Sequence, residues 1–145
     1  MVVHSVAEIV KTRTLPQSGP DITVSEACGV LDDLNVGALV VIEDDALIGI
    51  LSERDVIEKC IYPKKSTGQT RVREIMTPSP SVAHAACSPA EAMKLMVEGG
   101  FKHLPVVDGP RVVGLLSMQD VPSEYQVMLE QFTEAQSAPS YGLQQ

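Results

Sequence analysis

The sequence predicts an α+β fold made of two repeats, each in the order strand, helix, strand, strand, helix. Three observations carry this prediction. The chain has 145 residues and is 44% apolar, which is the size and composition of about one folded domain. It aligns with itself without a gap, and each copy contains a helix-capping signal followed by two short apolar runs. A unit of about 60 residues is marginally stable alone, so we expect the two repeats to share one core.

The internal repeat has a spacing of 65 positions, which lays residues 26–56 on residues 91–121. The similarity is strongest between residues 49–56 and 114–121, where a glycine, an apolar pair, a serine, an aspartate and a valine keep their spacing. Similarity at a fixed spacing indicates a duplicated structural unit. The identical pairs are Glu26/Glu91, Ala27/Ala92, Leu39/Leu104, Val41/Val106, Gly49/Gly114, Leu51/Leu116, Ser52/Ser117, Asp55/Asp120 and Val56/Val121.

A helix is predicted near the start of each repeat. Thr23 with Glu26, and Ser88 with Glu91, have the spacing of a capping box, and Pro89 suits the first helical position. Apolar residues then recur at helical spacing, which gives each helix one buried face. These apolar residues are Ala27, Leu31 and Leu34 in the first repeat and Ala92, Leu95 and Met96 in the second. The predicted ends are turn-prone residues: Asn35 and Gly37, then Gly99 and Gly100.

Two strands are predicted after each helix. In the first repeat they are residues 39–42 and 47–51, and in the second they are residues 104–107 and 112–116. Polar turns separate the members of each pair, which is typical of hairpins. A further helix is expected to start near Ser52 and again near Ser117.

The charge and the apolar runs exclude several partners. Nineteen acidic residues against 11 basic ones give a net charge of −8, which disfavours binding to nucleic acid and to anionic membranes. No apolar run approaches the ~18–20 residues that span a bilayer. The first residues lack a basic segment followed by a long apolar one, so we expect no secretory signal and a cytoplasmic protein.

Enzymatic chemistry is not predicted. Cys28, Cys60 and Cys87 are odd in number and contain no closely spaced pair, which argues against a disulfide framework and a metal site. There is no glycine-rich phosphate loop and no serine in a nucleophile elbow. The remaining enzyme hypothesis, a thiol-dependent one, needs an exposed cysteine of low pKa.

Residues 101–109 and 113–121 together resemble the signature of the CBS domain, named after cystathionine β-synthase. Residues 36–42 with 49–55 match the same pattern, and residues 74–77 resemble the segment that opens a second such domain. The resemblance covers about residues 6 to 130. It implies two β-α-β-β-α repeats packed as one pseudo-twofold module. The expected boundaries are domain 6–64, linker 65–71, domain 72–132 and a flexible tail, 133–145.

The resemblance also implies a function. Such modules bind an adenosyl nucleotide, AMP or ATP, with S-adenosylmethionine and NADH as further options, in the clefts between the repeats. In the family the aspartate of a Ser-x-x-Asp step reads both ribose hydroxyls, with the serine near the ribose or phosphate. The positions carried over are Ser52 with Asp55 and Ser117 with Asp120, and Thr77 is added to the expected ligand-binding residues. Read from the residues alone, the same step is equally a helix cap.

The basic residues predict unequal clefts. By resemblance, Lys102 and His103 serve the nucleotide on Asp55, with Arg54 as a third contact. The nucleotide on Asp120 then meets uncharged residues, which are Gly37, Ala38 and Gln119. We therefore expect one tight phosphorylated ligand per chain.

Two partners are expected besides the ligand. The residues Tyr125, Met128, Leu129 and Phe132 form an apolar stripe at helical spacing, which predicts a homodimer. Ligand occupancy is expected to change the affinity for an unidentified regulated protein. The rival hypothesis is a dimeric interaction scaffold whose clefts are degenerate and empty.

Overall fold

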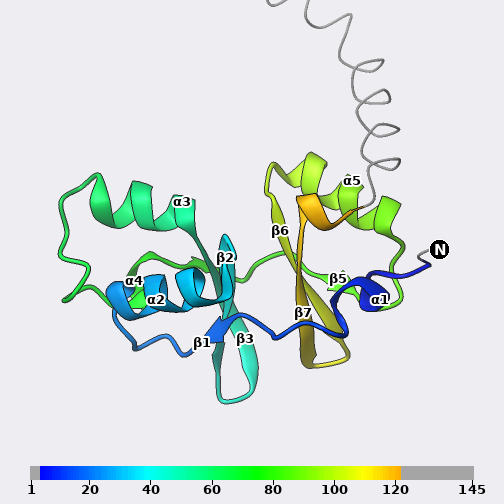
Figure 1. The fold of residues 1–145 in the computed structure, drawn as a ribbon, viewed down its shortest axis with the longest axis horizontal. Helices are drawn as coiled ribbons and strands as arrows, with labels where there is room; N and C mark the ends of the chain where they lie inside the picture. Colours follow the sequence, from blue (N-terminus) through cyan, green and yellow to red (C-terminus); the bar gives the residue numbers. More distant parts are fainter. Residues whose placement is uncertain (1–3, 122–145) are drawn as a thin grey trace, which may run out of the picture.

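A computed structural model describes residues 4–121 of the chain (Figure 1). The predicted tail, 133–145, and the apolar stripe of residues 125–132 lie outside this part. The elements in chain order are α1 (Val6–Val10), β1 (Gln17–Ser18), α2 (Val24–Leu34), β2 (Ala38–Glu43), β3 (Ala46–Ser52), α3 (Glu53–Val56), the π-helix η1 (Ile57–Ile61), α4 (Val72–Ile75), β4 (Thr77–Pro78), β5 (Ala83–His84), α5 (Pro89–Gly99), β6 (His103–Asp108), β7 (Arg111–Ser117) and the 3-10 helix η2 (Met118–Asp120).

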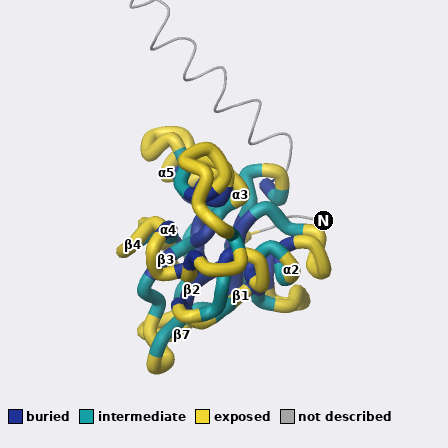
Figure 2. The backbone as a smooth tube through the Cα atoms, turned by 90° about the vertical axis from the view of Figure 1, so that its left-hand side faces the viewer, coloured by how far each residue is buried: buried dark blue, intermediate teal, exposed yellow. Residues whose placement is uncertain are grey.

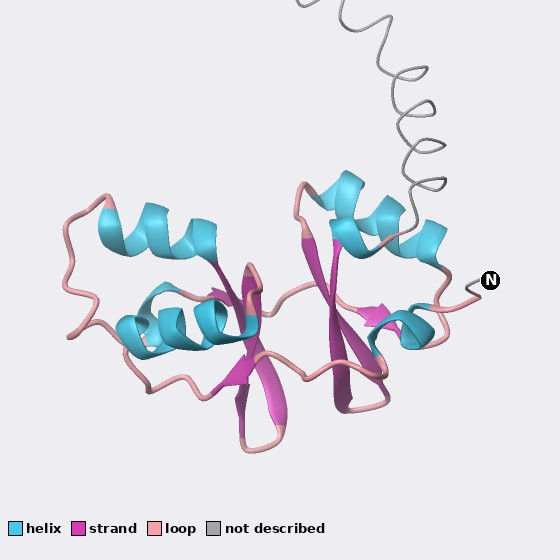
Figure 3. Ribbon diagram, viewed as in Figure 1, coloured by secondary structure: helices cyan, strands magenta, loops and turns pink. Residues whose placement is uncertain are grey.

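The strands form two sheets, in the orders β1-β2-β3-β4 and β5-β6-β7. Each sheet is built on an antiparallel hairpin, with a short strand parallel to its first member. The registers repeat, because Leu39 lies opposite Leu51 and Leu104 lies opposite Leu116. Figure 3 shows the two hairpins in the middle of the molecule and the helices toward its two flanks. The predicted α+β fold of two repeats is confirmed.

The capping signals form as predicted. The amide of Thr23 donates to the Glu26 carboxylate at 3.0 Å, and the amide of Glu26 donates to the Thr23 hydroxyl at 3.1 Å. The Ser88 hydroxyl accepts from the amide of Glu91 at 3.1 Å. Both helices end in a left-handed residue, α2 at Asn35 (φ 53°) and α5 at Gly100 (φ 73°). Asparagine and glycine are the residues that adopt this conformation most readily.

The opening helices of the two repeats are exchanged. Val6 and Val10 of α1 are buried in the core of the second sheet, whereas Val72 and Ile75 of α4 are buried in the core of the first. Hydrogen bonds fix both helices. The amide of Val6 donates to the Cys87 carbonyl at 2.8 Å, and that of Val72 donates to a first-repeat carbonyl at 2.9 Å. The following strand, β4, then pairs with β3 and extends the first sheet.

The repeated glycine of each β-hairpin makes this exchange possible. A Cβ atom on Gly114 would overlap the Val10 side chain of α1. The equivalent atom on Gly49 would lie 2.6 Å from the sulfur of Met76, in the segment after α4. A side chain at either position would therefore force its neighbour to move, so close packing rather than backbone conformation favours glycine at both.

The segment between the repeats forms backbone hydrogen bonds with the start of α2 in the first repeat. Thr70 is buried, and its carbonyl accepts from the amide of Val24 at 2.8 Å. A third buried cluster, Ala38, Val40 and Leu115, joins the two sheets. Figure 2 shows the buried backbone along the strands and the exposed backbone at the loops. The predicted boundaries at residues 64, 71 and 132 stay predictions.

Candidate functional site: two clefts between the repeats

Ser52 and Asp55 begin α3 with a reciprocal capping box. The amide of Ser52 donates to Asp55 Oδ2 at 3.0 Å, and the amide of Asp55 donates to the Ser52 hydroxyl at 3.1 Å. Asp55 is only 8% exposed. The helix-cap interpretation of this serine and aspartate is therefore confirmed, and the role in ligand binding stays a prediction.

The second oxygen of Asp55 is also occupied. The Thr77 hydroxyl, from β4, donates to Asp55 Oδ1 at 3.2 Å, and Lys59 Nζ lies 3.0 Å from the same oxygen. The structure thus brings Thr77, a predicted ligand-binding residue, to Asp55 from 22 residues away. Lys59 was not among the predicted site residues. Its position four residues after Asp55 on a predicted helix was the available signal.

A cavity of about 540 Å³ opens beside Asp55. It brings together six of the predicted residues, which are Ser52, Arg54, Asp55, Thr77, Lys102 and His103. Arg54 differs from the expectation in one respect, because its guanidinium is already bonded to Glu58 at 2.6 Å. Its side chain is 83% exposed. Lys102 and His103 reach this cavity from the start of the second hairpin.

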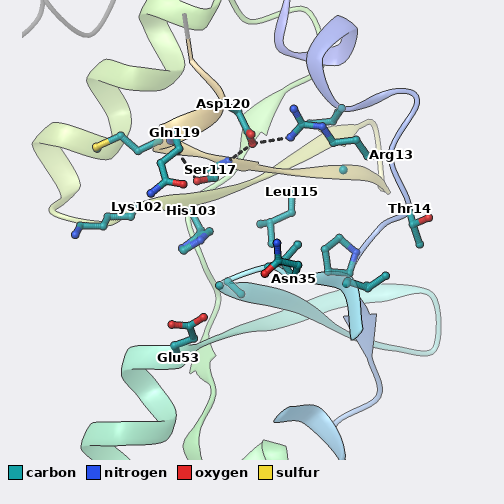
Figure 4. A pocket seen from close by; sticks show the side chains of 18 residues that line it. Arg13, Thr14, Asn35, Glu53, Lys102, His103, Leu115, Ser117, Gln119 and Asp120 are labelled. Carbon is teal, nitrogen blue, oxygen red and sulfur yellow. Dashed lines mark hydrogen bonds and ion pairs between the residues drawn. The ribbon is translucent and has the colours of Figure 1, made fainter. Parts of the chain in front are cut away.

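A second cavity of about 710 Å³ opens beside Asp120 (Figure 4). The amide of Ser117 donates to Asp120 Oδ2 at 2.8 Å. The same oxygen lies 2.8 Å from a guanidinium nitrogen of Arg13, in the segment between α1 and β1. Gln119 lines the cavity, as do Gly37 and Ala38.

The expectation that this cleft offers only uncharged residues is wrong. Arg13 and Lys102 both line it. The physical reason is the exchange of α1, which carries the following segment across the second sheet and sets Arg13 against Asp120. No repeat or motif in the sequence distinguishes Arg13, so its position could be found only from the fold.

The two cavities have a wall in common. Gly37, Glu53, Lys102 and His103 line both of them. Figure 4 shows the His103 ring between Asp120 and Glu53. A Cβ atom built on Gly37 would lie 3.3 Å from His103 Nε2, so the ring passes close to the bare backbone there.

Burial sets the charge of His103. Desolvation lowers its pKa below the ordinary value of 6.5, with a smaller lowering from Lys102, while the charges of Asp120 and Glu53 oppose the shift. The imidazole is therefore neutral at pH 7. Of the charged side chains on the common wall, Lys102 supplies the positive charge and Glu53 the negative one.

Other chemistry is weakly supported among residues 4–121. Burial raises the pKa of the Cys28 and Cys87 thiols, which is opposite to what a thiol-dependent enzyme needs. No group of three metal-ligating side chains gathers in these residues. No helix there is long and apolar enough to cross a membrane.

Known proteins resemble the chain over both repeats. The profile of the CBS domain matches residues 6–62 and 72–124. The CBS domain-containing protein YhcV of Bacillus subtilis is 31% identical over 119 residues, covering 82% of this chain and 84% of that protein. The mitochondrial CBS domain-containing protein CBSX3 of Arabidopsis thaliana is 36% identical over 106 residues, covering 70% of this chain and 52% of that protein. The chain spans only 19% of the Arabidopsis protein CBSCBSPB5, with 36% identity over 109 residues and 74% of this chain covered.

Solved structures agree with the fold. A protein with CBS domains from Burkholderia ambifaria is 34% identical, with a TM-score of 0.76, covering 81% of this chain and 90% of that one. The CBS domain NE2398 is 36% identical, with a TM-score of 0.75, covering 81% of this chain and 93% of that one.

Proposed function

This chain belongs to the CBS domain family, as a tandem pair of the kind that serves as a regulatory or ligand-binding module, and we propose that it binds an adenosyl nucleotide such as AMP or ATP in its two clefts. Occupancy of the clefts changes the affinity of the module for a regulated protein. S-adenosylmethionine and NADH carry the same adenosyl group and are the alternative ligands.

One observation carries the proposal: each cavity is lined by an aspartate, and the two cavities share a wall that carries Lys102. Asp55 and Asp120 offer the charged acceptor that a ribose diol needs, and Lys102 offers a cation for a phosphate. Cavities of about 540 and 710 Å³ are in the size range of small-molecule sites, about 300–1,000 Å³.

The test is calorimetric titration of the full chain with AMP, ATP, S-adenosylmethionine and NADH. We expect heat with at least one of them, and a loss of one site in the Asp55→Ala variant and of the other in Asp120→Ala. Lys94→Ala is the control, because Lys94 pairs with Glu98 on α5 and lines neither cavity. Absence of binding to all four ligands would reject the proposal.

The rival function is a dimeric scaffold with empty clefts. It is favoured by the fact that both carboxylates already have internal cations, Lys59 on Asp55 and Arg13 on Asp120. A ribose must displace or share these contacts. A homodimer in which light scattering shows two chains, combined with no heat from any adenosyl ligand, would select this function instead.

The setting of the module is proposed as well. Its relatives are named for their CBS domains rather than for a reaction, and we propose that the chain itself is not an enzyme. A net charge of −8 supports a module that does not bind nucleic acid. We propose the cytoplasm as its compartment.

A further inference from the structure

The common wall of the two cavities carries two basic side chains, Lys102 and the neutral His103, that pair with no carboxylate among residues 4–121. Arg54 is bonded to Glu58, and Arg13 is bonded to Asp120. Among residues 4–121, by contrast, the Lys102 and His103 side chains make no hydrogen bond or ion pair. Both cavities therefore depend on the same two groups to neutralise a phosphate.

The charges on this wall do not suffice for two phosphates. A phosphate monoester carries a charge of about −1.5 to −2 at pH 7. Lys102 contributes one positive charge, His103 contributes another only after taking up a proton, and Glu53 contributes a negative charge to both cavities. A second phosphate beside this wall meets groups that the first one has already recruited.

We propose that the two clefts bind phosphorylated adenosyl ligands antagonistically, because a phosphate in either cleft recruits Lys102 and His103 away from the other. The inference rests on the proposed function and adds its regulation. Adenosine, which lacks the phosphate, fills the two clefts independently. The coupling is reciprocal: each ligand weakens the other by the same factor.

The test compares each cleft with and without its neighbour. Calorimetry gives the dissociation constants of AMP and adenosine for the full chain and for the single-cleft variants Asp55→Ala and Asp120→Ala. We expect the second AMP to bind the parent roughly 5- to 150-fold more weakly than it binds the same cleft in the single-cleft variant. Adenosine should show no such difference.

A wall variant, Lys102→Ala with His103→Gln, separates a shared cation from a general effect of charge. Combined with each single-cleft variant it completes a double-mutant cycle. In the wall variant AMP should bind more weakly overall and the coupling should vanish. Lys94→Ala, which removes a cation from outside both cavities, should leave the coupling unchanged.

Each outcome decides the inference. One AMP per parent chain, with one AMP on each single-cleft variant, is the strongest form of antagonism and supports it. The inference is overturned if the parent chain binds two AMP molecules as tightly as the single-cleft variants bind one. It is also overturned if the coupling persists in the wall variant, or if only one of the single-cleft variants binds AMP. Adenosine binding without any coupling of AMP rejects the inference alone. Absence of binding of both AMP and adenosine also overturns the inference, and it rejects the proposed function when ATP, S-adenosylmethionine and NADH give no heat either.

Discussion

Two substitutions of Asp55 separate its role as a helix cap from its proposed role in reading ribose. Asp55→Ala removes both carboxylate oxygens, so the buried box loses the acceptor for the Ser52 amide and for the Thr77 hydroxyl. Asp55→Asn keeps one side-chain oxygen for the Ser52 amide but loses the charge. The capping role needs the oxygen, whereas the ribose role needs a charged acceptor.

The magnitudes differ between the two variants. Loss of a cap costs about 0.5–2 kcal/mol, and a buried donor left without an acceptor costs about 1–3 kcal/mol. Asp55→Ala should therefore lower the free energy of unfolding by about 2–4 kcal/mol, which a typical domain survives, and Asp55→Asn by about 1 kcal/mol. Loss of the charged acceptor should weaken the binding of adenosine by about 1.5–3 kcal/mol, or roughly 10- to 100-fold, in both variants.

Urea unfolding measures the first effect and calorimetry with adenosine measures the second. Glu26→Ala is a matched control, because Glu26 closes the same kind of capping box at the start of α2 and lines neither cavity. It should lower stability without changing the affinity for adenosine. If Asp55→Asn binds adenosine as tightly as the parent chain does, Asp55 is only a cap and the ribose role is wrong.

Three further outcomes are expected. Gly114→Ala should destabilise the chain by about 1–3 kcal/mol in urea unfolding, because its new methyl group displaces α1, whereas Gly29→Ala, at an exposed position of α2, should stabilise it by up to about 1 kcal/mol; equal effects would contradict the packing argument. The pKa of His103 lies below 6.5, and a bound phosphate raises it. AMP affinity should therefore increase as the pH falls toward the pKa of His103, and calorimetry should show that the complex takes up a proton. His103→Gln should flatten this dependence, and an unchanged profile would exclude His103. Light scattering should show a homodimer that Ile61→Lys weakens, because Ile61 is a 53% exposed apolar residue on η1; a parent chain that is already a monomer would refute this.

The sequence predicts well what depends on local spacing. The 65-residue repeat and its capping signals predicted both hairpins and both long helices, because strands, caps and turns are encoded by neighbouring residues. The start of α3 at Ser52 was predicted for the same reason. The family resemblance predicted in addition which distant residues share a site. The structure brings Thr77 and Lys102 to the Asp55 cavity.

Contacts that depend on the path of the chain could not be predicted in this way. Nothing in Val6 or Val10 states which of two similar sheets their short helix joins, since either apolar core would accept valine. Arg13 therefore could not be assigned to Asp120, and the expectation of an uncharged cleft failed there. The cationic partner of Asp55, Lys59, was overlooked although its spacing was visible.

The exchange of α1 and α4 has a consequence for how the pair unfolds. The core of the second sheet includes α1 of the first repeat, and the core of the first sheet includes α4 of the second repeat. If either repeat unfolds, the core of the other repeat therefore loses a helix. The two CBS domains therefore unfold as one cooperative unit, in a single transition, rather than as two independent domains. For the same reason a lone repeat is an incomplete fold: it keeps a helix with no sheet to cover and a sheet with an open face, and only a second copy can close both.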